Sequence, residues 1–325
     1  MKITLTYNEK RSDAEREAEF DSRDAIAAIA RLLASLGHVA VPLDVTGSIP
    51  RLATALRRIK PDVVFNFAEG ERGAFREAFY PALFEQLALP HTGSAASALA
   101  VCMDKALAKR VVASARVRVP RGRVVRSPAD PLGDLEPPLI VKPNLEGSSK
   151  GVTPASVISE PGKLHAAVAA ALARYPGGVL VEEWIPGREV AVGWVRGIGL
   201  LPPIEYRFEG QIYDFALKHT HPERVDVRVP AELSDPVAAR LQRAASRAFE
   251  ALGIEGYGRA DFRITPEGEV VFLEMNPLPS LTLAAGHDEL YVAAAAIGRS
   301  PTELLAAILD AVPAARFDQI DLVAV

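Results

Sequence analysis

The sequence predicts a mixed α/β and α+β protein of three domains. The chain has 325 residues, more than one hydrophobic core usually holds, and 49% of them are hydrophobic. Roughly its first ninety residues alternate fully apolar strands with helices, which is typical of a parallel sheet covered on both faces. We therefore expect domains at 1–94, 95–181 and 182–325.

In the N-terminal domain we expect a strand at 3–7, where every second residue is apolar. A helix follows at 22–37, between a serine cap and a glycine stop. A strand at 39–43, a helix at 49–59 and a strand at 63–65 complete the alternation. No GxGxxG follows the first strand and no GxxxxGK(S/T) occurs, so two common phosphate-binding fingerprints are missing.

The two later domains each combine helices with strands. The predicted elements are, in order, a helix at 97–112, a strand at 139–142, a helix at 163–174, strands at 179–182 and 189–195, a helix at 241–252, a hairpin within 258–277 and a helix at 301–311. The alanine-rich stretch 291–297 predicts one more buried helix, far shorter than the ~20 apolar residues that cross a bilayer.

Charge and cysteine content exclude several functions. With 41 acids against 37 strong bases, the chain lacks the positive excess that draws proteins to nucleic acid. Cys102 is the one cysteine, so neither an intrachain disulfide nor a cysteine-rich metal site forms, which fits a reducing compartment. The start, 1–10, is too polar for a secretory signal. We expect a soluble cytoplasmic protein without nucleic-acid or membrane partners.

The hairpin carries the strongest chemical signal. Closing it at the turn 265–268 places Asp261 opposite Glu274, and Arg259 opposite Asn276. Because strand side chains alternate, these residues share one face, and two facing carboxylates destabilise a sheet unless positive charge lies between them. Oxygen ligands of this kind suit Mg²⁺.

The other face of the hairpin is expected to be buried. It carries only apolar side chains, namely Ala260, Phe262, Ile264, Val271, Leu273 and Met275. The alternative to a metal site is a solvated polar face whose acids pair with Arg259 and Arg263.

Two further segments offer contacts to a ligand. Lys142 precedes a loop, 143–152, whose glycines and serines let backbone N–H groups approach a phosphate; an ordinary surface loop is the alternative. At 179–189 an apolar strand runs into acids, Trp184 and a Pro-Gly turn, where a flat heterocycle could lie between domains. A plain linker with Trp184 in a core is the alternative there.

In this order, the segments resemble the ATP-grasp superfamily and, within it, the D-alanine–D-alanine ligase family. The resemblance extends from about residue 63 to the C-terminus. It implies a three-domain ATP-grasp fold with an N-terminal parallel-sheet (Rossmann-like) domain, and ATP between the other two domains. The matching segments are 92–94, 103–105, 141–152, 181–189, 213–218, 259–261 and 274–277.

The resemblance also implies a role for each matching residue. The implied catalytic residues are Arg259 as oxyanion stabiliser, Lys218 near the transferred phosphate, Ser148 in the glycine-serine loop (146–151), and Glu15 and His219 beside the substrates. The implied nucleotide contacts are Lys105, Lys142, Ser149 and Lys218 at the phosphates, Glu182, Glu183, Trp184 and Ile185 at adenine, and Glu189 at ribose. The implied metal ligands are Asp261, Glu274 and Asn276.

The family chemistry is peptide-bond formation for the cell wall. ATP converts a carboxylate into an acyl phosphate, which an amine then attacks. The protein mainly positions the reactants and neutralises charge, with Mg²⁺ (two ions, which Mn²⁺ could replace). The resemblance therefore implies small amino-acid or carboxylate substrates, and it suggests a homodimer through the N-terminal domain.

The chain departs from the family pattern where substrates bind. The first strand ends in 6–8 as Thr-Tyr-Asn instead of Gly-Gly, and Glu19 rivals Glu15 as the substrate-binding acid. The segment 68–73 replaces a His-Gly followed by Gly-Glu-Asp-Gly. His219 stands in place of a tyrosine, and Ser280 in place of a loop glycine.

Asp288 is the sharpest departure. Counting back from Gly298, it falls where the family has a serine that binds the acceptor's carboxylate, although a three-residue shift would put Ala285 there. Two carboxylates about 4 Å apart repel by roughly 1 to 4 kcal/mol. We therefore expect an acceptor that is not simply D-alanine: it lacks a carboxylate there or presents a cation. His219, His221 and His287 form no HExxH zinc motif.

Two other functions remain open from the sequence. One is a ligase for other amino acids or small carboxylates in specialised metabolism. The other is an ATP-binding regulatory protein without turnover, against which Arg259 argues, because a mere binder needs no oxyanion stabiliser.

Overall fold

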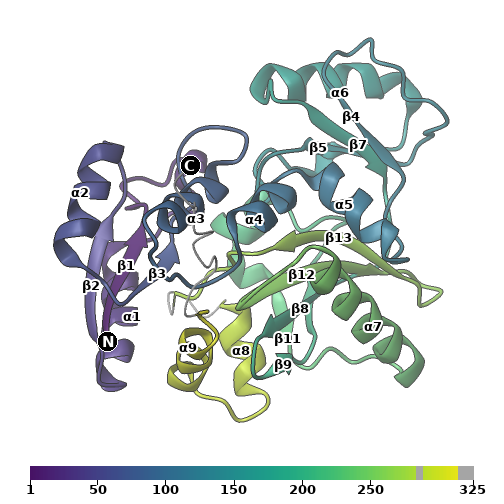
Figure 1. Cartoon of the computed structure of the whole chain (residues 1–325). Coiled ribbons are helices and arrows are strands. Elements are labelled where there is room, and N and C mark those ends of the chain that lie inside the picture. Colours follow the sequence, from purple (N-terminus) through teal and green to yellow (C-terminus); the bar gives the residue numbers. More distant parts are fainter. Residues whose placement is uncertain (283–287, 314–325) are drawn as a thin grey trace, which may run out of the picture.

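The computed structural model describes residues 1–282 and 288–313. In that part of the chain the strands form three sheets (Figure 1). The N-terminal sheet forms one side of the molecule, and the other two sheets lie one above the other on the opposite side. The predicted mixture of an N-terminal parallel sheet with later α+β units is confirmed.

The N-terminal sheet is parallel, in the order β2-β1-β3. Its strands are β1 (Lys2–Tyr7), β2 (Val39–Asp44) and β3 (Val63–Phe67), and its helices are α1 (Arg23–Ser35), α2 (Ile49–Ile59) and α3 (Arg76–Gln86). Apolar residues of α1 pack with β1 on one face, while α2 and α3 pack on the other. Helices therefore cover both faces, as the apolar strands predicted.

The predicted continuous helix at 97–112 is wrong. The structure has two helices there, α4 (Ala96–Met103) and α5 (Lys105–Ser114), separated by Asp104 in an extended conformation. The Asp104 carboxylate accepts hydrogen bonds from the Leu107 backbone N–H at 2.9 Å and from the Asn144 amide at 2.8 Å. An aspartate that can cap a new helix competes with helix continuation, and here the cap prevails.

The second sheet is antiparallel, in the order β4-β7-β5-β6. Its strands are β4 (Gly122–Val125), β5 (Leu139–Pro143), β6 (Val157–Ile158) and β7 (Val179–Glu183), and α6 (Pro161–Arg174) packs on it. The domain division expected after residue 181 falls inside β7, because Glu182 and Glu183 still pair with β5.

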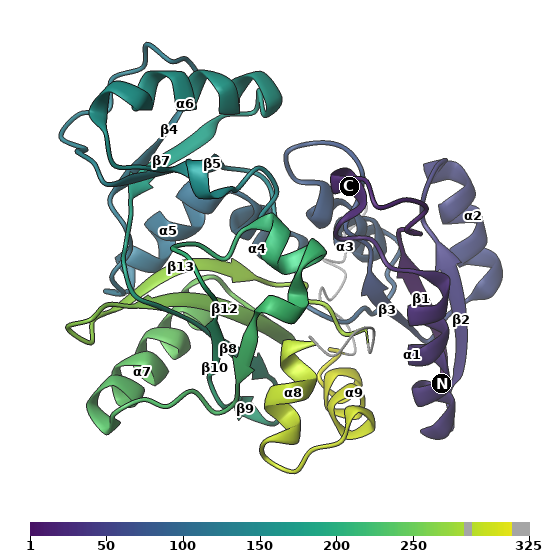
Figure 2. The same cartoon turned by 180° about the vertical axis from the view of Figure 1, so that it is seen from behind.

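The third sheet has the order β11-β10-β8-β12-β13, with β9 paired to β8. Its strands are β8 (Arg188–Val195), β9 (Gly199–Leu200), β10 (Ile204–Arg207), β11 (Asp226–Arg228), β12 (Tyr257–Ile264) and β13 (Val270–Asn276). The helix α7 (Asp235–Ala251) packs on one face, while α8 (Glu289–Ala295) and α9 (Pro301–Asp310) pack on the other (Figure 2).

A β-bulge changes which residues of the hairpin face the core. Asp261 pairs with Glu274, but the next residue, Phe262, pairs with Phe272, so Leu273 is left over. The expectation that Val271 and Leu273 share the apolar face is therefore wrong. The core contains Ala260, Phe262, Ile264, Val270, Phe272 and Met275.

One hydrophobic core joins the two ends of the chain. It combines side chains of β1, β3 and α1 with those of β8, β10, α8 and α9. The second sheet and α6 have a separate core. No helix within 1–282 or 288–313 is both long and apolar enough to cross a membrane.

Candidate active site

Two adjoining cavities lie where the three sheets meet. The first, which we call the nucleotide cavity, lies between the second and third sheets and is lined by Lys105, Lys142, Ser149, Glu182, Glu183, Trp184, Ile185, Glu189, Asp261 and Glu274. The second, the central cavity of about 420 Å³, is lined by residues of all three sheets' domains, among them Glu19, Ser148, Lys218, His219, Arg259, Asn276 and Asp288. Tyr213, Glu146 and Lys105 line both cavities.

One end of the nucleotide cavity is an aromatic platform. The Arg263 guanidinium lies 4.7 Å from the centre of the Trp184 ring and bonds to Glu189 at 2.7 Å. Ile185 is buried beside them, and the Glu183 carboxylate bonds to Arg121. Trp184 is only half-buried, so it faces a cavity and is not a core residue.

Glu182 is the buried anion of this cavity. Its carboxylate lies 2.7 Å from Lys142 Nζ and 3.1 Å from Lys109 Nζ. Burial alone would raise the pKa of Glu182, but the two lysine charges lower it. Lys109 is also buried, and its pKa falls to about 8 because burial disfavours the ammonium more than Glu182 favours it.

The other end of the nucleotide cavity gathers the predicted metal ligands. Strands β12 and β13 place Asp261 opposite Glu274 and Arg259 opposite Asn276, so the predicted register of these pairs is confirmed. The Asn276 amide donates to Asp261 at 2.9 Å, and Lys105 Nζ lies 2.8 Å from Glu274.

The two acids differ in their pKa values. Burial raises the pKa of Asp261 despite Arg259. Burial acts in the same direction on Glu274, but Lys105 and Lys142 more than offset it and lower its pKa. No group of three or more His, Cys, Asp or Glu side chains suited to a metal occurs among the described residues, so a cation here would rely on two acids and an amide.

Arg259 lies deep at the boundary of the two cavities. It makes a forked pair with Asp261 at 2.8 and 2.9 Å and lies 3.3 Å from Glu289. These two acids raise the pKa of Arg259, although burial by itself would lower it. Asp261 therefore pairs with Arg259 as the alternative expectation described, but Glu274 pairs with Lys105, and this face lines a cavity and is not solvated.

The turn Ala216–Thr220 brings two more predicted residues to the central cavity. Lys218 lines it, and no carboxylate in the described chain lies within 4 Å of its ammonium. His219 Nε2 lies 3.2 Å from the Ser148 carbonyl, and its ring lies on Phe215 at 4.5 Å. Burial and the Lys218 charge lower the pKa of His219 to about 4, so the imidazole is neutral at pH 7.

The glycine-serine loop is held in a bent conformation. Ser148 and Ser149 have φ angles of 52° and 55°, which non-glycine residues adopt only when their surroundings impose it. The Ser149 hydroxyl donates to the Tyr213 carbonyl at 3.2 Å. Lys150 bonds to Glu19 of the N-terminal domain, which ties the loop across the central cavity.

The rival glutamates lie in different places. Glu19 lines the central cavity and pairs with Arg76 at 2.9 Å as well as with Lys150. Glu15 lies outside the lining of both cavities and accepts a hydrogen bond from the Gly151 N–H at 2.8 Å. Both acids therefore hold the loop, and only Glu19 also faces the cavity.

Sequence reasoning missed several participants. Lys109, Lys150 and Arg76 gave no signal, because their importance depends on partners from distant segments. The sequence named Arg263 only as a partner of the hairpin acids, whereas it bonds to Glu189 and lies over the Trp184 ring. Ala285 and His287 lie outside the described residues.

Comparison with known proteins places the chain in a family. The family model "D-ala D-ala ligase C-terminus" matches residues 125–310. The D-alanine–D-alanine ligase of Geobacter sulfurreducens is 34% identical over 88% of this chain and 87% of its own length. That of Gloeobacter violaceus is 34% identical over 95% of this chain and 99% of its own length.

Solved structures agree with the fold. The D-alanine–D-alanine ligase of Bacillus anthracis complexed with ATP has a TM-score of 0.74 at 21% identity and covers 96% of this chain and 97% of that one. The VanG D-Ala:D-Ser ligase of Enterococcus faecalis has a TM-score of 0.73 at 23% identity and covers 95% and 98%. From this match across nearly its whole length, the chain belongs to the D-alanine–D-alanine ligase family of ATP-dependent amide-forming ligases.

Proposed function

We propose that this protein uses ATP and Mg²⁺ to join the carboxyl group of one amino acid to the amine of a second. One observation carries the proposal most directly: Lys105, Glu274 and Asp261 stand together where the nucleotide cavity meets the central cavity. Positive charge that would hold phosphate and oxygens that would bind a metal thus lie beside a cavity of about 420 Å³.

The nucleotide cavity suits ATP along its length. Trp184 and Ile185 offer a flat apolar site for adenine, and Glu189 lies beside them for the ribose. Lys105 and Lys142 would hold the phosphates with charge that needs no fixed geometry. Ser148 and Ser149 belong to the loop that covers this end, with backbone N–H groups available to phosphate oxygens.

The residues at the hairpin fit a magnesium ion. Asp261 and Glu274 face each other across the strands, and Asn276 adds an amide within the same polar set. Glu274 keeps a low pKa, so this ligand is ionised at neutral pH. Bound there, Mg²⁺ would neutralise charge on the transferred phosphate.

The chemistry requires the γ-phosphate to pass to the first substrate's carboxylate, giving an acyl phosphate. The amine of the second substrate then attacks the carbonyl carbon, and phosphate leaves. Arg259 lies where it can stabilise the oxyanion of the tetrahedral intermediate, and Lys218 where it can contact the transferred group. Glu19 and the neutral His219 face the substrates in the central cavity.

Phosphate release from ATP, measured across a panel of D- and L-amino acids, tests the proposal. We expect amino-acid-stimulated release and a dipeptide product detectable by mass spectrometry. ATP binding without any stimulated release would support the regulatory ATP-binding protein instead. The Arg259→Lys variant sharpens the assay: it should still bind ATP but lose about a hundredfold or more of turnover, because the oxyanion loses a forked donor.

A homodimer through the N-terminal domain and a cytoplasmic location stay predictions. Analytical ultracentrifugation of the full chain tests the first, and cell fractionation tests the second.

A further inference from the structure

The central cavity holds more acid than its cations neutralise. Among the described residues, seven acids line it, namely Glu19, Asp21, Glu69, Glu77, Glu146, Asp288 and Glu289, against four cations, Lys10, Lys105, Lys218 and Arg259. Four of the acids have a cation within 4.0 Å, since Arg76, Lys150 or Arg259 pairs with each of Glu19, Glu77, Glu146 and Glu289. Asp21, Glu69 and Asp288 have none in the described part of the chain.

The cations of the cavity are committed elsewhere. Lys105 pairs with Glu274, Arg259 with Asp261 and Lys10 with Asp13. Lys218 is the remaining one, and the proposed reaction assigns it to the transferred phosphate. Among the residues that the structure describes, no cation lining the cavity is therefore left for the three unpaired acids.

Asp288 is the most unusual of the three. Its residue is 7% exposed, and its Oδ2 atom has no hydrogen-bond partner among the described residues. It enters the cavity from the C-terminal side, just before α8. Asp21 faces the same cavity from the N-terminal side, near enough for its charge to contribute to the raised pKa of Asp288. Leaving one buried carboxylate oxygen without a partner is costly, so a ligand group is expected there.

Two alanine substrates would not neutralise the unpaired acids of the central cavity. The first substrate brings one ammonium, which a single acid such as Glu69 can hold, and its own carboxylate is consumed by phosphorylation. The second must attack as a neutral amine, and its carboxylate would add negative charge beside acids that are already unpaired. At least one acid therefore remains without a counter-charge, and burial without a nearby cation raises the pKa of both Asp21 and Asp288 to about 7.

We propose that Asp288 and Asp21 select a substrate with a second ammonium group, a diamino acid such as ornithine or lysine, whose side-chain cation lies between them. The inference rests on the proposed ligase function and names the substrate class of the same site. The second ammonium is bound and does not react.

Matched substrates isolate the ammonium. Ornithine and norvaline share one carbon chain and differ only in the terminal amine, as do lysine and norleucine. With ATP and D-alanine as co-substrate, in both D and L series, we expect kcat/KM for the basic member to exceed that of its neutral partner about tenfold or more, a usual discrimination for one buried charge pair.

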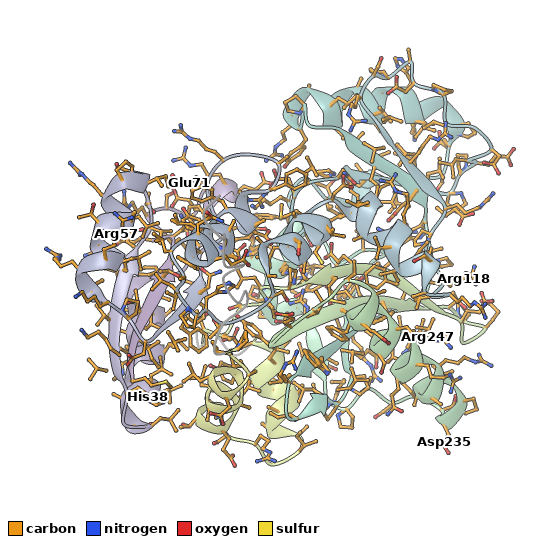
Figure 3. All side chains as sticks on the ribbon, viewed as in Figure 1. His38, Arg57, Glu71, Arg118, Asp235 and Arg247 are labelled. Carbon is orange, nitrogen blue, oxygen red and sulfur yellow. The ribbon has the colours of Figure 1, made fainter. Side chains whose placement is uncertain are left out.

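The variant Asp288→Asn should reduce that ratio about tenfold or more. Asp21→Asn should also lower the kcat/KM ratio of the basic to the neutral amino acid. This variant replaces Asp288→Asn as the test if Asp288→Asn does not fold. Asp235→Asn is the control, because Figure 3 shows Asp235 at the outer edge of the molecule. Equal rates for ornithine and norvaline, or a ratio unaltered in both cavity variants, would overturn the proposal.

Binding separates this proposal from the ligase function. Turnover with neutral amino acids but no preference for basic ones would sink the substrate class alone. If no amino acid stimulates ATP turnover, the ligase proposal fails, and calorimetry of ornithine and norvaline on the protein with ADP and Mg²⁺ then decides the substrate class. Tighter binding of ornithine that Asp288→Asn abolishes supports it, and equal or absent binding of both contradicts it.

Discussion

Glu274 is central to the proposed metal site, because it faces Asp261 across the hairpin and bonds to Lys105 of α5. Glu274→Gln keeps the shape of the side chain but removes the charge that balances Lys105 and would hold Mg²⁺. We expect kcat/KM for MgATP to fall about a hundredfold, equivalent to about 3 kcal/mol. Steady-state kinetics at varied Mg²⁺ measures it.

Glu267→Gln is the matched control for that variant, because Glu267 lies in the exposed turn of the same hairpin. It should leave the kinetics unchanged. A Glu274→Gln enzyme with normal Mg²⁺ dependence would contradict the metal assignment.

Asp288 should make stability depend on pH in an unusual direction. Burial raises its pKa from 3.8 to about 7, with Glu289 and Asp21 adding to the effect and the Ser280 hydroxyl opposing it. An acid whose folded pKa is raised binds a proton more readily when folded, so its stabilising contribution is present below pH 4 and is lost as the pH rises through 7.

Relative to the wild type, Asp288→Asn should therefore gain stability between pH 4 and pH 8, by up to about 4 kcal/mol, since one pKa unit corresponds to about 1.4 kcal/mol. Urea unfolding at a series of pH values measures the difference. The nearby Tyr291 hydroxyl does not titrate in this range, because burial raises its pKa further. A constant difference across the range would show that Asp288 is ionised throughout.

At the scale of elements, the break between α4 and α5 determines where Lys105 points. Asp104 caps α5 and also bonds to Asn144 at the start of the loop after β5. Asp104→Ala should cost about 1 to 2 kcal/mol of stability for the cap and raise KM for ATP, because Lys105 is the next residue. Chemical unfolding and ATP kinetics measure the two effects.

Ser300→Ala supplies the comparison, since the Ser300 hydroxyl caps α9 by accepting a hydrogen bond from the Glu303 N–H at 3.2 Å, and Ser300 lines neither cavity. This comparison variant should lose a similar free energy of unfolding, while its KM for ATP stays unchanged. If Asp104→Ala behaves in the same way, the cap does not position the lysine.

Most elements could be predicted from the sequence, because their apolar periods are strong. The helix α2 has the predicted bounds, and the facing of Asp261 and Glu274 followed from alternation and the turn. The bulge could not be seen, since 270–273 is uniformly apolar and any residue there could be the extra one. The helix α3 was not predicted because Pro81 lies inside it.

The site was predictable only where one segment holds several of its residues. The hairpin and the strand that contains Glu182 can each be recognised from one short stretch of sequence. The pairing of Lys150 with Glu19 spans distant segments, and so does the placement of Asp21 and Asp288 in one cavity. Such contacts depend on how the domains pack, which no periodicity encodes.

At the scale of the whole molecule, the separation of the hydrophobic cores predicts which parts of the chain unfold locally most easily. The core that contains β1 and α1 also contains α8 and α9, whereas the second sheet and α6 have a core of their own. We expect hydrogen exchange at 122–183 to exceed that of β1 and β12, and to slow when ATP and Mg²⁺ are added.

Exchange mass spectrometry with and without nucleotide tests this expectation, with β1 as the internal reference. Leu305→Ala gives a second test, because it cuts into the shared core and should loosen β1 while sparing the second sheet. Uniform loosening across all three sheets would contradict separate units.

Leu273, the extra residue of the β-bulge, decides which faces the side chains of β13 occupy. If Leu273 paired with Phe262, the pairing along β12 and β13 would be uninterrupted. Because side chains alternate, such regular pairing would turn either Phe272 out of the core or Glu274 and Asn276 out of the cavities. The bulge thus lets one strand present Phe272 to the core while Glu274 and Asn276 face the cavities.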